Sequence, residues 1–194
     1  MDYFDLKFKE SGNIESLFSD CFGRACRLLG FNLNEEYNSH REDKGNFMKF
    51  EDDAVIYIIK LCSSFVNPSA RARFSRYVND KQEIINIVEK KDSRLKFIFY
   101  KTNADFLLLS FGIVSDDQIN HESSIEMGKY CYRFASAYRQ ELRFGDDDLG
   151  SVLMKMAANF EKYADILACM KRNQFSPYKM YNDDEFSALV DKIH

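Results

Sequence analysis

Residues 95–114 have the sequence LKFIFYKTNADFLLLSFGIV, and this stretch decides whether the fold is all-helical or contains β structure. Leu95, Phe97 and Phe99 occupy alternate positions, which is typical of a strand and allows a hairpin that turns at 102–105. However, the turn contains no Gly, whereas tight hairpin turns favour pairs such as Asn-Gly. The three consecutive leucines favour a helix on intrinsic propensity. We therefore expect a helix at 95–113, with a β-hairpin at 95–114 as the alternative.

As a helix, this stretch would bring its apolar side chains to one side. That predicted side consists of Leu95, Ile98, Phe99, Thr102, Phe106, Leu109 and Ile113.

Apolar side chains that recur every three or four residues predict helices along much of the rest of the chain. The first of these is followed by Gly30, at the position where a left-handed residue commonly ends a helix. The two longest are joined by a short acidic link, so we expect them to pack antiparallel as the spine of a bundle. The expected helices cover residues 14–29, 52–65, 69–78, 125–142, 149–172 and 184–193, with a further one after Asp80.

The composition agrees with a helical class. Two Pro and eight Gly in 194 residues are few for the many tight turns of a barrel or sandwich. We expect an all-α, single-domain bundle of six or seven helices spanning residues 1–194. The class becomes α+β if 95–114 is a hairpin. The polar segment 32–49 is expected to be a long loop, and loops of that length are commonly functional.

Three segments in the second half of the chain share a pattern with other proteins. They are ADFLLLSFGI at 104–113, IEMGKYCYRFA at 125–135, and 153–167 with NFEKY at its centre. Over about residues 50–170 the chain resembles a group of uncharacterised bacterial all-helical proteins. In that group an Asp-aromatic-x-Leu-Phe…Gly-Phe-Phe segment precedes a Met-Gly…Tyr…Ala helix. The resemblance implies an all-helical fold and transfers no catalytic residue.

Charge and cysteine content bear on the compartment. The net charge of −4 argues against a general nucleic-acid coat or a polybasic membrane binder. The N-terminal residues lack a basic segment followed by an apolar run, and no stretch approaches the roughly 18 apolar residues of a membrane span. The five Cys include no C-x-x-C pair, so buried reduced thiols are favoured over zinc or disulfides. We expect a cytoplasmic protein without membrane association.

Motifs of catalysis and cofactor binding are missing from the sequence. It contains no phosphate-binding glycine loop, no nucleophile elbow and no paired histidine motif. His121 and Glu122 follow Asp116 and Asp117, which allows a carboxylate–imidazole cluster, although a solvated loop explains the same residues. We therefore expect no metal, no cofactor and no catalytic residue. Any chemical role of His40 or His121 stays open, and an enzyme with an unrecognised site is the third interpretation.

A basic segment departs from the acidic character of the chain. Residues 69–101 contain nine Lys or Arg and four acidic residues. Arg71, Arg73 and Arg76 are interleaved with aromatic residues including Tyr77, a combination that suits phosphates and stacked bases. These four residues form the predicted anion or nucleic-acid site. The alternative is a solvated helix face that pairs with acidic groups of the same molecule.

The helix expected at 125–142 carries features of an interaction surface. Small residues from Gly128 to Ala137 allow another helix to approach closely. Tyr130, Arg133 and Tyr138 are of the residue types enriched in interface hot spots, although intramolecular packing would also explain them. The leading function hypothesis is a non-catalytic helical protein-interaction module, with a protein partner or a homodimer. Nucleic-acid or polyanion binding through residues 71–101 is the alternative.

Overall fold

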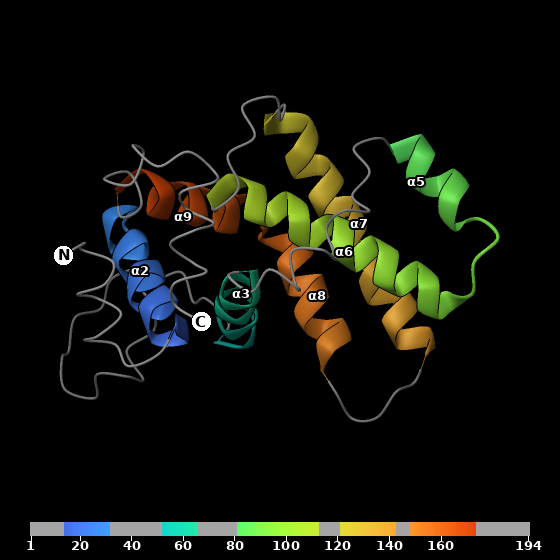
Figure 1. Cartoon of the computed structure of the whole chain (residues 1–194), viewed down its shortest axis with the longest axis horizontal. Helices are drawn as coiled ribbons and strands as arrows, with labels where there is room; N and C mark the ends of the chain where they lie inside the picture. Colours follow the sequence, from blue (N-terminus) through green and yellow to red (C-terminus); the bar gives the residue numbers. More distant parts are fainter. Residues whose placement is uncertain (1–13, 32–51, 66–80, 113–120, 143–147, 174–194) are drawn as a thin grey trace.

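The structure is a computed structural model that describes residues 14–31, 52–65, 81–112, 121–142 and 148–173 (Figure 1). The described residues form seven α-helices and no strand. The fold class is therefore all-α, as expected. The helices are α2 (Ile14–Leu28), α3 (Asp52–Phe65), α5 (Lys81–Val88), α6 (Ser93–Gly112), α7 (His121–Glu141), α8 (Leu149–Ala158) and α9 (Phe160–Asn173).

The hairpin alternative is wrong over the described part of that stretch, because α6 is one continuous helix of 20 residues. It begins at an N-cap: the side chain of Asp92 accepts a 2.8 Å hydrogen bond from the backbone N–H of Leu95. The expected loop at 32–49 and the expected helices at 69–78 and 184–193 lie outside the described residues.

The end of α2 follows the pattern predicted from Gly30. Gly30 has φ +74°, in the left-handed region that glycine adopts without strain. The Gly30 N–H donates to the Arg27 carbonyl at 3.1 Å, and the Phe31 N–H donates to the Cys26 carbonyl at 2.8 Å. These two bonds form a Schellman motif, which satisfies carbonyls that the end of a helix leaves without partners.

The buried side of α6 differs from the predicted one. Leu95 and Ile98 are each 47% exposed, although both were expected on the core side. The side chains that enter the core are Tyr100, Asn103, Ala104, Asp105, Leu107, Leu108, Leu109, Ser110 and Phe111. The prediction failed because this helix is apolar on several sides, so the periodicity does not select one of them.

The predicted helix at 149–172 is also wrong as a single element. It divides at Asn159, whose φ of −112° and ψ of 17° leave helical geometry. The Asn159 side-chain amide donates to the carbonyl of Lys155 at 3.2 Å, the kind of local bond that makes Asn unfavourable inside helices. The break separates two helices, α8 packing mainly on α7 and α9 on α6 and α2 (Figure 1).

Helices α7 and α8 run antiparallel, as predicted for the two long helices, although α7 begins four residues earlier than expected, at His121 (Figure 1). Their contact is close where Ser136, fully buried on α7, donates a 2.6 Å hydrogen bond to the carbonyl of Gly150. Helix α3 is tied to α8 by an ion pair of 2.8 Å between Asp53 and Lys155. Among the described helices, none is long and apolar enough to cross a membrane.

Candidate functional site

The four residues of the predicted anion site, Arg71, Arg73, Arg76 and Tyr77, lie outside the described residues. The predicted interface residues Tyr130, Arg133 and Tyr138 all lie on α7. Tyr130 and Tyr138 are half-buried, and Arg133 is exposed. The described candidate residues therefore all belong to α7.

Four aromatic rings come together between α6 and α7. Tyr130, Phe134 and Tyr138 are four residues apart on α7, a spacing that aligns side chains along one side of a helix. Tyr100 of α6 is buried against this row and stacks on Phe134, with ring centroids 5.2 Å apart, and on Tyr138, at 5.8 Å. Tyr130 lies 4.6 Å from Phe134. We call these four residues the α6–α7 aromatic face.

Two lysines cover the ends of the α6–α7 aromatic face. The ammonium group of Lys81, at the start of α5, lies 4.4 Å from the ring centroid of Tyr130. That of Lys96 on α6 lies 5.4 Å from the ring centroid of Tyr138. Neither lysine forms an ion pair with a carboxylate of the described residues. Both charges are therefore held by cation–π contacts alone within this part of the chain.

Phe134 is the most exposed ring of the α6–α7 aromatic face. It is 37% exposed, whereas Tyr100 is 3% exposed. The four-residue spacing of the three aromatic residues on α7 was the signal that could have identified this row.

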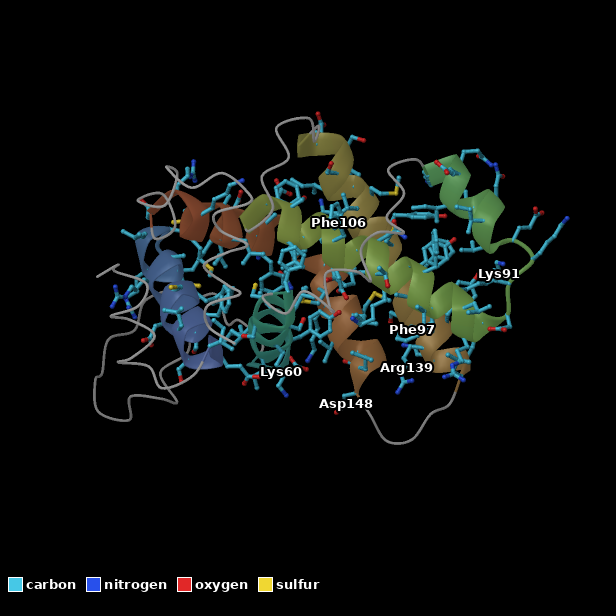
Figure 2. All side chains as sticks on the ribbon, in the orientation of Figure 1. Lys60, Lys91, Phe97, Phe106, Arg139 and Asp148 are labelled. Carbon is cyan, nitrogen blue, oxygen red and sulfur yellow. The ribbon has the colours of Figure 1, made fainter. Side chains whose placement is uncertain are left out.

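Arg133 does not join the rings. It directly precedes Phe134, and successive residues of an α-helix point about 100° apart. A neighbouring arginine, Arg139, instead covers the ring of Phe97 on α6, with 5.7 Å between the guanidinium carbon and the ring centroid (Figure 2). The structure therefore brings Tyr130 and Tyr138 together but leaves Arg133 on an adjacent side.

A second cluster lies inside the bundle around Asp105 of α6, a residue that is 4% exposed. One carboxylate oxygen accepts hydrogen bonds from the hydroxyl of Tyr57 at 2.5 Å and of Tyr132 at 2.8 Å. The other accepts a bond from the ammonium group of Lys101 at 2.5 Å. A carboxylate buried between helices is tolerated only with such partners.

Burial raises the pKa of Tyr57 and of Tyr132 well above that of an ordinary tyrosine, and the neighbouring Asp105 carboxylate raises both further. Both hydroxyls therefore remain protonated and act as donors. The ammonium group of Lys101 also lies 5.0 Å from the ring centroid of Tyr57. Because all of these donors point to one carboxylate, the cluster connects α3, α6 and α7 rather than presenting a reactive group.

The described part of the chain contains no cluster of side chains that could bind a metal ion. No group of three or more His, Cys, Asp or Glu side chains there could hold an ion. The side chain of His121 and all of His40 lie outside the description. All five cysteines are buried and none is in a disulfide, and burial raises the pKa of Cys62 and of Cys131 to about 12. Such thiols are poor nucleophiles and poor metal ligands at neutral pH.

Comparisons with known proteins give no relative from which a role can be transferred. No family model matches the chain, and neither a curated protein nor a solved structure matches it. The resemblance to bacterial helical proteins therefore stays a prediction.

Proposed function

We propose that this protein is a non-catalytic interaction module that binds another protein through the α6–α7 aromatic face. The observation that carries the proposal is Phe134, a large apolar ring 37% exposed in the middle of a row of aromatic residues. Interface centres are enriched in aromatic side chains, and a few such residues supply most of the binding free energy.

The order of the α6–α7 aromatic face supports the same proposal. Phe134 contacts three other rings, two of them at the centroid distances of 5.2 and 4.6 Å given above, so its position is fixed before a partner arrives. A side chain that is already fixed loses little conformational entropy on binding. The proposed surface is therefore preorganised.

Site-specific photo-crosslinking tests the proposal in cells that express the protein naturally. A photo-crosslinking phenylalanine analogue replaces Phe134 in one version of the full chain and Asp165, an exposed residue of α9, in a control version. We expect protein adducts from position 134 and far fewer from position 165. Equal adduct formation at both positions, or none at 134, would overturn the proposed function.

A further inference from the structure

Resting on the proposed function, we infer that the partner of the α6–α7 aromatic face is an acidic protein segment in which an apolar side chain lies between two carboxylates. The apolar side chain would pack on Phe134, the exposed ring at the centre. The two carboxylates would pair with Lys81 and Lys96 at the ends.

The two lysines are available to such a partner. Each ammonium group has three N–H donors, and the ring beneath it occupies only one side of the group. Neither lysine has a carboxylate partner within the described part of the chain. A carboxylate can therefore approach from outside and form a charge-assisted hydrogen bond while the cation–π contact is retained.

The spacing of the rings on α7 predicts the spacing of the acidic and apolar residues in the partner. Tyr130 and Tyr138, which lie beneath the two lysines, are eight residues apart on α7, and Phe134 is midway between them. At 1.5 Å per residue, the backbone positions of Tyr130 and Tyr138 are about 12 Å apart along the axis of α7. An amphipathic helix with acidic residues eight positions apart and an apolar residue midway has the same spacing.

Charge and ring geometry favour an acidic protein segment over a second copy of this chain and over single-stranded nucleic acid. A two-fold dimer through this face would place the same patch on both subunits, so the lysines of the two copies would lie close together and repel. Single-stranded nucleic acid binds by stacking bases on free aromatic faces. Here Lys81 and Lys96 cover two rings, and Tyr100 is buried.

Selection from a displayed library of helical peptides on the immobilised full-length protein tests the inference. We expect enriched peptides to carry Asp or Glu eight residues apart with an apolar residue midway. The variant Phe134→Ser should lose the enrichment, and circular dichroism of that variant shows whether it is folded.

The double variant Lys81→Glu/Lys96→Glu should bind a selected acidic peptide at least about tenfold more weakly and should select peptides with Lys or Arg at those positions. A matched control is Lys90→Glu/Lys91→Glu, which makes the same charge change at exposed lysines between α5 and α6; Lys91 points away from the molecule (Figure 2). This control should retain most of the affinity.

Three outcomes would overturn the inference. The first is that the selection enriches basic or neutral peptides, or enriches no peptide at all. The second is that a 20-nucleotide poly(dT) strand binds in fluorescence anisotropy and that this binding depends on Phe134. The third is that the protein dimerises in sedimentation equilibrium and that the dimer depends on Phe134. Crosslinking from position 134 to a second copy or to a basic partner would leave the proposed function standing and reject only the acidic segment.

Discussion

The ring of Phe160 on α9 lies directly against the backbone of Gly128 on α7. A β-carbon added to residue 128 would come within 2.1 Å of Cζ of that ring. The ring is itself enclosed, since it is fully buried and contacts Phe111 and Tyr132 at centroid distances of 6.2 and 5.9 Å. The missing side chain of Gly128 is therefore what allows α9 to pack here.

The substitution Gly128→Ala should destabilise the protein by about 1–3 kcal/mol, the usual effect of forcing extra volume into a packed core. The sign of the change in the free energy of unfolding tests the contact, because a Gly-to-Ala substitution in an unobstructed helix stabilises it by roughly 0.5–1 kcal/mol. Urea denaturation followed by circular dichroism measures the difference. In a Phe160→Leu background the penalty should shrink, whereas a stabilising Gly128→Ala in the wild-type background would contradict the contact.

Replacing either tyrosine of the Asp105 cluster by phenylalanine should also destabilise the protein. Tyr57→Phe and Tyr132→Phe each remove a hydrogen bond to a carboxylate, and such bonds contribute about 1.5–3 kcal/mol. The loss at Tyr57 should be the smaller one, since that residue is only partly buried. Tyr138→Phe is the matched control and should change the free energy of unfolding by less than about 0.5 kcal/mol. Equal effects at all three positions would argue against the cluster.

Stability should fall in alkaline solution because of the same two hydroxyls. Their pKa values are raised in the folded state, so their contribution is complete below the tyrosine pKa of the unfolded chain, near 10, and is lost as the pH rises above it. The free energy of unfolding should therefore decrease more steeply above pH 10 in the wild type than in Tyr57→Phe or Tyr132→Phe. Parallel curves for all three proteins would contradict the raised pKa values.

The cysteines should be unreactive while the protein is folded. All five are buried, and burial raises the pKa of Cys26, Cys62 and Cys131 to about 12, so these thiols carry almost no thiolate at neutral pH. At pH 8, Ellman's reagent should react slowly with native protein and rapidly with five thiols in urea. Rapid reaction of a thiol in the native state would show that it is accessible and would contradict its burial.

The sequence by itself determined the helical class and several boundaries. The three consecutive leucines and the lack of Gly in 102–105 were sufficient to favour a helix for α6. The left-handed Gly30 was likewise predictable from its position after an apolar stripe. These features depend on residues within a few positions of one another, and local backbone preferences act over that range.

The candidate site was only partly predictable. Residue type was enough to single out Tyr130 and Tyr138, because tyrosine is common in interfaces. Their association with Tyr100, 30 and 38 residues earlier in the chain, depends on how α6 packs on α7. The exposure of Phe134 likewise depends on what covers α7, and no local pattern contains that information.

Tertiary structure alone decided which polar and apolar side chains meet in the interior. Asp105 receives hydrogen bonds from Tyr57 and Tyr132, which are 48 and 27 residues away. The burial of this carboxylate is favourable only after three helices have assembled around it, so α6 by itself gives no reason to turn Asp105 inward. The same holds for Gly128, whose helix could carry any small residue until the ring of Phe160 packs against it. Periodicity specifies a helix, whereas the choice of its buried side depends on the shape and the hydrogen-bonding groups of its neighbours.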